Sequence, residues 1–168
     1  MYQLTEETEG DWWDVEALYD LCFAPSRTAL SSYRLREGVP TVAALCLILR
    51  DEDAALAAAI RYWPAEIQTA HGAEDVLLLG PIAVHPTRQG EGLGALLINQ
   101  SLAQARRLGW ERVLLVGDAP YYGRFGFVKL PGVEMPPPTN PDRILGLALK
   151  LGAWDGVTGR VTRAGGSL

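Results

Sequence analysis

The sequence predicts a single α/β domain in which apolar strands alternate with amphipathic helices. Its 168 residues suit one domain of ordinary size. Hydrophobic residues make up 48% of the chain, which is enough for a core without disulfide bonds or a structural metal. Apolar runs of strand length, such as RVLLV, are separated by segments with the apolar spacing of a helix. We therefore expect residues 1–168 to form one domain, with a weakly patterned tail over residues 153–168.

The first part of the chain predicts a strand followed by two helices. Weak alternation in YQLTEET, residues 2–8, indicates a strand. Asp11 stands where it can cap a helix over WWDVEALYDLCF, residues 12–23, whose apolar side chains share one face. A second, short helix is expected over residues 29–38, where Gly38 ends it.

The middle of the chain predicts a hairpin and then a buried strand. The polar stretch RDED lies between two apolar runs and favours a hairpin over residues 41–64, although AALAAAI has the composition of a helix. The polar segment PAEIQTAHGAED, residues 64–75, is expected to be a connection. The run VLLLGPIAVHP, residues 76–86, indicates a buried strand with a bulge at Gly80 and Pro81.

The rest of the chain predicts a long helix and further strands. Apolar spacing indicates a helix over residues 92–108, followed by a buried strand within ERVLLVGD, residues 111–118. PYYGRFGF, residues 120–127, predicts a short helical turn that leads into a strand. A proline-rich loop over residues 131–142 precedes RILGLALKL, residues 143–151, which we expect to be the last strand.

Composition argues against several classes of protein. The net charge of −5 disfavours a nucleic-acid binder, which needs a basic face for phosphates. No apolar run approaches the ~18 residues that span a membrane, and the first residues lack the pattern of a signal peptide, so we expect a cytoplasmic protein. Cys22 and Cys46 stand far apart without metal-ligand spacing, which predicts two reduced, buried thiols and no metal site.

The stretch VHPTRQGEGLGALL joins the predicted strand to the long helix through three alternate glycines, Gly90, Gly92 and Gly94. A glycine loop at a helix N-terminus presents free amides and predicts an anion site, with phosphate as its natural ligand. A P-loop is excluded because no Lys-Ser or Lys-Thr follows. A dinucleotide fingerprint fits Gly90, Gly92 and Ala95, with Asp118 further on, but five residues separate the strand from the first glycine.

The whole stretch has a more specific pattern. It reads V-x-P-x-x-Q-x-x-G-x-G and resembles the acetyl-CoA pyrophosphate loop of the GNAT family of N-acetyltransferases. The residues that carry the resemblance are Val84, Pro86, Gln89, Gly92 and Gly94.

A second motif of the same family follows in YYGRFGF. Tyr122, Gly126 and Phe127 fit its pattern Y-x-x-x-G-[FY], and the resemblance is firm over residues 76–129. The form of both motifs is most similar to the bacterial YhbS-like branch. The resemblance implies a mixed, mostly antiparallel sheet with helices on both faces, within the α/β (α+β) class. It also implies acetyl transfer from acetyl-CoA to a primary amine by direct attack, without a covalent enzyme intermediate.

The resemblance further assigns the cofactor site. The pantetheine arm is expected to pair with the backbone of residues 82–84 like an added strand, and the pyrophosphate to rest on the amides of residues 89–94. Arg88 would either add charge or remain solvated, and the carboxylate of Glu91 is expected to point outward. The cofactor-binding residues are therefore expected to be Ile82, Ala83, Val84, Gln89, Gly90, Glu91, Gly92, Leu93 and Gly94.

Transfer requires a polarised thioester carbonyl and a proton for the departing thiolate. The resemblance makes the backbone of Val84 the candidate for the first task and Tyr122 the candidate acid for the second. Tyr62 and Trp63 either line an acceptor pocket or pack in the core. The base is not assigned: the candidates are a chain of waters and the side chains of Glu37, Glu74, Asp75, His85 and Asp118.

The expected partners are acetyl-CoA and a small amine or peptide acceptor. The acidic net charge slightly favours a cationic acceptor such as a polyamine. A homodimer is an expectation carried by the resemblance, because members of the family often dimerise. Two other functions stay open at this point, namely a non-catalytic acyl-CoA sensor and a dinucleotide-binding oxidoreductase.

Overall fold

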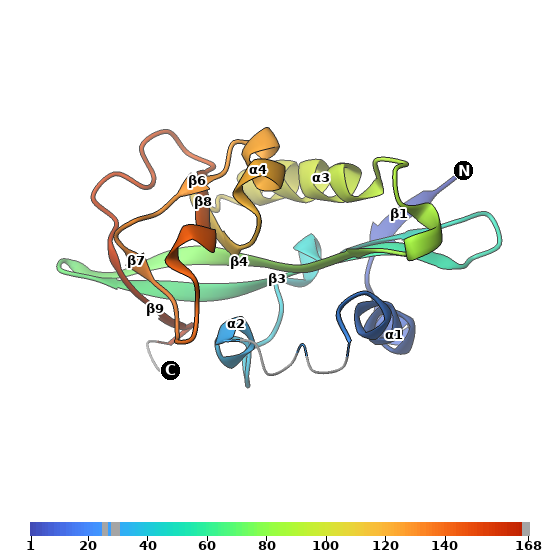
Figure 1. The fold of residues 1–168 in the computed structure, drawn as a ribbon, viewed down its shortest axis with the longest axis horizontal. Coiled ribbons are helices and arrows are strands. Elements are labelled where there is room, and N and C mark those ends of the chain that lie inside the picture. The colour runs from blue at the N-terminus through green and yellow to red at the C-terminus, as the bar shows by residue number, and fades with distance from the viewer. Residues whose placement is uncertain (25–26, 28–30, 166–168) are drawn as a thin grey trace.

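The computed structural model describes residues 1–24, 27 and 31–165, which form one sheet with helices on both faces (Figure 1). Helices α1 (Trp12–Phe23) and α2 (Ser31–Arg34) cover one face. Helices α3 (Leu93–Arg107) and α4 (Ala119–Tyr122) cover the other. Helix α2 is shorter than expected, and residues 29 and 30 lie outside the described part of the chain.

The sheet of the described residues has nine strands, seven of them in the order β1-β2-β3-β4-β5-β8-β6, with β9 beside β3 and β7 beside β9. Only β4–β5 and β7–β9 are parallel pairs, so the prediction of a mixed, mostly antiparallel sheet between helices is confirmed. The strands are β1 (Gln3–Glu6), β2 (Leu47–Arg50), β3 (Leu56–Thr69), β4 (Gly72–Val84), β5 (Arg112–Val116), β6 (Val128–Lys129), β7 (Val133–Glu134), β8 (Ile144–Ala148) and β9 (Gly159–Arg163). Short 3-10 turns cover Glu9–Asp11, Ala43–Leu45, Pro86–Arg88, Gly123–Phe125 and Pro141–Arg143.

Asp11 precedes helix α1 as predicted, but it acts differently from a capping residue. Its side chain makes no hydrogen bond to the first turn of the helix. Instead the carboxylate accepts hydrogen bonds from the amide and the hydroxyl of Thr8, at 2.8 and 2.9 Å, and pairs with Arg50 at 2.8 Å. Asp11 therefore fixes the turn that leads into the helix and ties that turn to β2.

The expected polar connection over residues 64–75 is wrong, because β3 and β4 continue through it as one long hairpin. The turn lies at Ala70 and His71. Within the segment, Ala65 and Ile67 are buried, whereas alternate residues are polar. This period of two is a strand pattern, and the charged residues of the segment occupy its more exposed positions.

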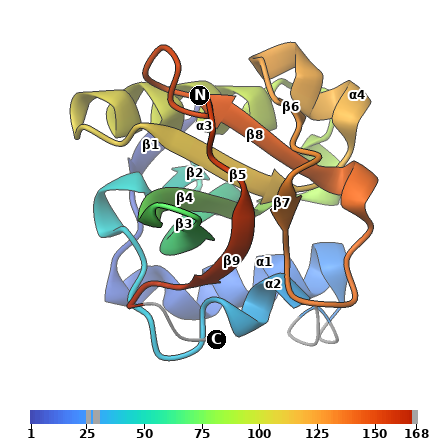
Figure 2. The same cartoon turned by 90° about the vertical axis from the view of Figure 1, so that its left-hand side faces the viewer.

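The strand over residues 143–151 is not the last one. Strand β9 lies in the weakly patterned tail and pairs with residues 65–68 of β3, as Figure 2 shows. Val161 is completely buried there. A Cβ on Gly159 would lie 1.9 Å from the carbonyl oxygen of Gln68, so only glycine allows the two backbones to approach this closely.

The predicted bulge at Gly80 and Pro81 is confirmed, and it reverses which side chains of β4 face each layer. The register with β3 shifts at this point, so that β4 contains one extra residue. Before the bulge, Leu79 packs in the core under α3, and after it Ile82 does so. Ala83 packs against α1 on the opposite face. The bulge thus lets both segments of β4 bury apolar side chains under α3.

Candidate active site

Strand β4 loses its neighbour halfway along its length. Its ladder to β5 contains only Leu77 and Leu78, opposite Val113 and Leu114. Strand β4 continues to Val84, six residues further, while β5 turns into the loop before α4. The edge of β4 beyond Leu78 therefore lies open.

The backbone of Ile82 and Val84 faces this opening. The amide of His85 donates to the carbonyl of Ala57 at 2.8 Å, which fixes which residues of β4 bond to β3. Since bonding alternates along an antiparallel pair, Ala83 also directs its backbone groups at β3, and Ile82 and Val84 direct theirs away from it. Of residues 82–84, two thus direct backbone amides at a ligand that adds itself as a strand, although the carbonyl of Val84 already accepts hydrogen bonds from Gln89 and Cys22.

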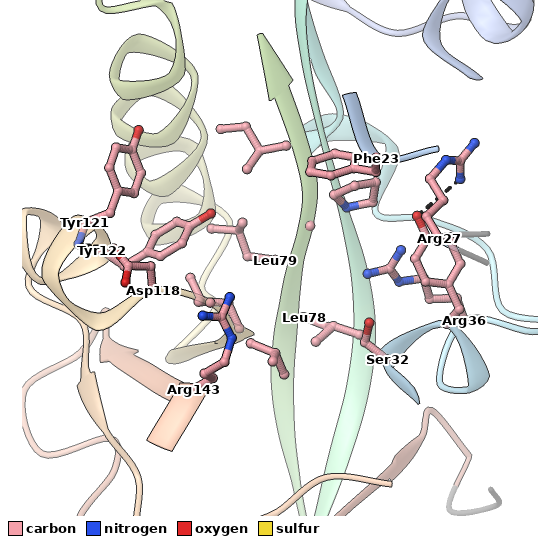
Figure 3. A pocket seen from close by; sticks show the side chains of 17 residues that line it. Phe23, Arg27, Ser32, Arg36, Leu78, Leu79, Asp118, Tyr121, Tyr122 and Arg143 are labelled. Carbon is pink, nitrogen blue, oxygen red and sulfur yellow. Dashed lines mark hydrogen bonds between the residues drawn. The ribbon is translucent and has the colours of Figure 1, made fainter. Parts of the chain in front are cut away.

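Two cavities meet at this opening. The larger, of about 390 Å³, lies between α1, α2, the bulge of β4 and the loop after β5 (Figure 3). The smaller, of about 320 Å³, lies between the end of β4 and the first turn of α3. Both are lined by Phe23, Ile82, Tyr121 and Tyr122. Two ligands that enter from opposite sides of the sheet would therefore meet beside these four residues.

The glycine loop has the backbone conformation of an anion site. Gly90 and Gly92 have φ angles of 84° and 78°, in the left-handed region that favours glycine, and Gly92 immediately precedes α3. Space is tight at Gly94, because a Cβ there would lie 3.2 Å from the hydroxyl oxygen of Tyr121. Within the described residues, the amides of residues 90–95 have no hydrogen-bond acceptor. These amides and the helix dipole attract negative charge.

Side chains hold the glycine loop in place, whereas the positive potential of the loop comes mainly from its backbone amides. The amide nitrogen of Gln89 donates to the carbonyl of Val84 at 3.0 Å, which closes the loop onto the end of β4. Arg88 pairs with Asp51 at 2.5 Å, so its charge is largely neutralised. Glu91 is exposed, as expected, but it also accepts a hydrogen bond of 2.6 Å from the hydroxyl of Tyr2.

The two tyrosines of the second motif direct their hydroxyls differently. In Figure 3 the hydroxyl of Tyr122 points toward Leu79 of β4, whereas Tyr121 extends toward α3 and Gly94. The ring of Tyr122 covers Gly117, where an added Cβ would lie 2.6 Å from it. Burial, assisted by Tyr121, raises the pKa of Tyr122 to about 12. Tyr122 is therefore protonated at neutral pH, and its hydroxyl has no partner among the described residues.

The structure separates the candidate bases. Asp118 lines the larger cavity, where its carboxylate accepts the amide of Tyr121 at 3.1 Å. Glu37 is exposed and pairs with Arg163 at 3.3 Å, on the outside of the molecule. The other candidates, Glu74, Asp75 and His85, lie at the far end of β4 or in the turn before the glycine loop, outside both cavities.

An ionic network stabilises the wall of the larger cavity. Glu16 of α1 accepts from Arg27 at 2.9 Å and from Arg61 of β3, and Arg61 also pairs with Glu7 at 2.8 Å. Burial raises the pKa of Glu16, but the hydrogen bonds from both arginines outweigh it and lower that pKa overall. The network joins α1 to β3 and fixes Arg27 beside the cavity.

Tyr62 and Trp63 do not line either cavity. Tyr62 is completely buried and its hydroxyl is hydrogen-bonded to Ser101 at 2.7 Å. Trp63 donates its indole N–H to the carbonyl of Val39 at 3.0 Å and lies against Arg36. The cavity walls include four further side chains that no sequence motif singled out: Phe23, Tyr33, Arg36 and Arg143.

The thiols and carboxylates form no metal centre in the described ranges. Cys46 is buried and Cys22 is half-buried, and both are free. Burial raises the pKa of each thiol, so both are protonated at neutral pH. Cys22 donates to the carbonyl of Val84 over 3.4 Å at the smaller cavity.

No helix in the described part of the chain has the length and apolarity to cross a membrane.

Comparison with known proteins agrees with this geometry. Residues 12–127 match the model of the acetyltransferase (GNAT) family. The chain is 28% identical over 140 residues to the uncharacterized N-acetyltransferase YjhQ of Escherichia coli K12, covering 83% of this chain and 76% of YjhQ. It is 29% identical over 116 residues to the uncharacterized N-acetyltransferase YhbS of the same strain. That alignment covers 67% of this chain and 65% of YhbS, slightly less than two thirds of that protein.

Solved structures share the fold over most of the chain. Escherichia coli YhbS in complex with CoA superposes with a TM-score of 0.82 at 24% identity, covering 96% of this chain and 89% of that one. A GNAT family acetyltransferase from Brucella melitensis in complex with acetyl-CoA gives a TM-score of 0.72 at 26% identity, covering 96% and 95%.

Proposed function

Because the chain belongs to the GNAT family of acetyltransferases, we propose that it transfers the acetyl group of acetyl-CoA directly to a primary amine. The observation that carries this proposal is the continuity of three features: free amides in the glycine loop, an open edge of β4, and two cavities that meet at Tyr122. The first two features fit a pyrophosphate followed by an extended amide-bearing arm. The third gives an amine access to the end of that arm.

The cofactor would lie along the α3 side of β4. Its pyrophosphate would bind the amides of residues 89–94, where the left-handed glycines keep side chains away from the phosphates. Its pantetheine arm would bond to the backbone of Ile82 and Val84 in the manner of an added strand. Ala83 lies between these two residues and would not bond to the arm, because its own backbone groups face β3. Glu91 and Leu93 would contribute only their backbone amides.

The reaction would take place where the cavities meet. Backbone amides on the open edge of β4 would polarise the thioester carbonyl, and Val84 is one such group. Ile82 is another, and it lines both cavities. A neutral amine in the larger cavity would attack the carbonyl carbon, and the hydroxyl of Tyr122 would donate its proton toward the departing sulfur. Asp118 is the candidate base that the geometry retains for the proton released by the amine.

Two titrations and one assay test this function. We expect calorimetric titration to show binding of acetyl-CoA and no binding of NAD. We expect a panel of primary amines to include some that release free CoA thiol when they are added with acetyl-CoA. Binding of NAD without binding of acetyl-CoA would overturn the proposal. Binding of acetyl-CoA without thiol release from any amine would favour the non-catalytic sensor instead.

The organisation of the chain stays a prediction. We propose that residues 1–168 act as one domain and that the protein works in the cytoplasm. The expectation of a homodimer is tested by light scattering at micromolar protein, where a mass of 18.3 kDa would identify a monomer and contradict it.

A further inference from the structure

The larger cavity carries more positive charge than its own residues neutralise. Three arginines line it, together with one carboxylate, that of Asp118. Arg27 is neutralised by Glu16 at 2.9 Å and Asp20 at 3.1 Å. Arg36 and Arg143 have no acidic side chain within 4.0 Å in the part of the chain that the structure describes. Two cations therefore face the acceptor side of the site without a counter-ion.

Arg36 is held in a position that leaves two of its three donor nitrogens without a partner among the described residues. Its guanidinium carbon lies 3.9 Å from the centre of the Tyr33 ring and 4.8 Å from that of Trp63. Its Nε and Nη1 atoms are buried, and neither has a hydrogen-bond partner among the described residues. Leaving charged donors without partners costs stability, and such a group in a folded protein calls for an explanation, of which an ordered water and an acceptor atom of a bound ligand are two.

The guanidinium of Arg36 lies beside the bulge of β4 and faces the larger cavity. Its Nη2 atom lies 4.0 Å from where a Cβ on Gly80 would stand, at the bulge. Figure 3 shows the guanidinium pointing from the α2 side toward β4, across the cavity from Tyr122. The glycine loop lies before α3, on the other face of the sheet (Figure 1). The phosphates of a cofactor bound there do not provide the anion that Arg36 lacks.

We propose that the acceptor is an amine that also carries a carboxylate, and that Arg36 binds this carboxylate. The inference rests on the proposed acetyl transfer and names the class of acceptor for it. Aromatic rings against the guanidinium direct its donors into its own plane, and its Nη2 atom, which lies nearest the bulge, would donate to a carboxylate oxygen. Arg143 adds positive charge from the opposite wall of the cavity. An acceptor amino acid would thus be held by its carboxylate while its amine reaches the thioester.

Matched acceptors test the inference. L-amino acids and their carboxamides present the same amine and side chain, and they differ in the anionic group. We expect the carboxylates to be acetylated with kcat/KM higher by on the order of 10- to 100-fold, mainly through KM, because a hydrogen-bonded ion pair is lost in the amides. Equal rates for both members of each pair, or faster acetylation of the amides, would overturn the inference while leaving the acetyl transfer intact.

Variants of Arg36 locate the effect. Arg36→Gln is expected to abolish the preference for carboxylates with an unchanged Kd for acetyl-CoA, and Arg36→Lys to retain part of it. Arg106→Gln removes an exposed arginine of α3 and serves as the control, with the preference unchanged. If Arg36→Gln does not fold, Arg143→Gln is expected to reduce the preference several-fold. Retention of the full preference in the folded Arg36→Gln protein would refute the assignment.

A binding measurement keeps the inference testable without turnover. N-acetyl-L-amino acids and their carboxamides are titrated calorimetrically into the protein, with and without CoA. We expect the carboxylates to bind at least about tenfold more tightly than the amides. Equal affinities would overturn the carboxylate site. Failure of acetyl-CoA itself to bind would overturn the proposed function, and this separate result distinguishes the two failures.

Discussion

Replacement of Tyr122 by phenylalanine removes one oxygen atom from the point where the two cavities meet. The ring packs over Gly117 and makes an edge contact with the ring of Phe127 at 6.0 Å between centroids. Phenylalanine keeps both contacts, and within the described residues the hydroxyl forms no hydrogen bond that would be lost. We therefore expect Tyr122→Phe to fold normally and to bind acetyl-CoA with the Kd of the wild type.

The size of the effect on kcat follows from the raised pKa. Burial raises the pKa of Tyr122 to about 12, while a free thiol has a pKa of ~8.5. Complete proton transfer to a thiolate of that basicity would be uphill by about 3.5 pKa units, or ~5 kcal/mol. The same cavity also removes water from the thiolate, which raises the pKa of the thiol and so reduces the difference between the two pKa values. The hydroxyl therefore acts mainly as a hydrogen-bond donor to developing charge, worth about 1.5–3 kcal/mol.

We therefore expect kcat to fall by about 10- to 150-fold in Tyr122→Phe. Thiol release under saturating acetyl-CoA measures kcat, and a pre-steady-state burst experiment shows whether chemistry limits the rate. Tyr121→Phe is the matched control, because its hydroxyl points toward α3, and we expect its kcat to change less than about threefold. A threefold or smaller loss in Tyr122→Phe, with chemistry limiting, would refute the assignment.

The pH profile provides an independent check on the same residue. The phenol is the active form, and it is present below a pKa of about 12. No loss of kcat through ionisation of Tyr122 is therefore expected between pH 7 and 11. An alkaline limb near pH 10 that is present in the wild type and absent in Tyr122→Phe would contradict the burial argument.

Three further predictions concern the loop, the ionic network and the tail. Gly92→Val forces a β-branched residue into a left-handed φ of 78° and adds a side chain to the anion site, so the Kd for acetyl-CoA should rise at least about tenfold by calorimetry; an unaltered Kd would contradict the placement. Glu16→Ala removes the carboxylate shared by Arg27 and Arg61 and should lower the free energy of unfolding in urea at pH 7 by about 1–3 kcal/mol, less than for a fully buried pair because Glu16 is 23% exposed. The pKa of Glu16 is lowered in the folded protein, so its stabilisation is present above its ordinary pKa of 4.5 and is lost as the pH falls through the folded pKa. A stability difference between Glu16→Ala and the wild type that grows in acid would contradict this pH dependence. Gly159→Ala should destabilise by on the order of 2 to 6 kcal/mol, because the new Cβ meets the carbonyl of β3 at a positive φ; a normal melting temperature would show that β9 does not pack as described.

Sequence patterns predicted the long helices and the most apolar strands, but they missed some strands that have one buried face. The long hairpin of β3 and β4 is the clearest of these cases. Residues 64–75 contain enough charge to resemble a loop, yet Ala65 and Ile67 alternate with polar neighbours and belong to a strand. Strand β9 carries an even weaker signal, because its five residues gain their burial from β3 and β7, which are distant in the sequence. Short strands of this kind are specified by tertiary contacts more than by their own pattern.

The donor and acceptor halves of the site also differ in how far a local sequence pattern specifies them. The donor half is one contiguous loop, where Gln89, Gly92 and Gly94 each meet a local requirement of the backbone. The loop is recognisable in the sequence because that requirement is expressed within a few residues. The expected pairing of a cofactor with Ala83 depends on the register with β3, which no local pattern contains.

The acceptor half shows why net charge is a poor guide to what a site binds. An overall charge of −5 slightly favours a cationic acceptor, but most of the acidic groups lie on the surface or pair with neighbours, as Glu16 does with Arg27. The field in a cavity depends on the nearest unpaired groups, since more distant exposed charges are screened within about 10 Å at moderate salt. In the larger cavity these groups are Arg36 and Arg143, which are separated by more than a hundred residues and meet only in the fold. Local charge therefore opposes the global charge, and it is the local charge that an acceptor meets.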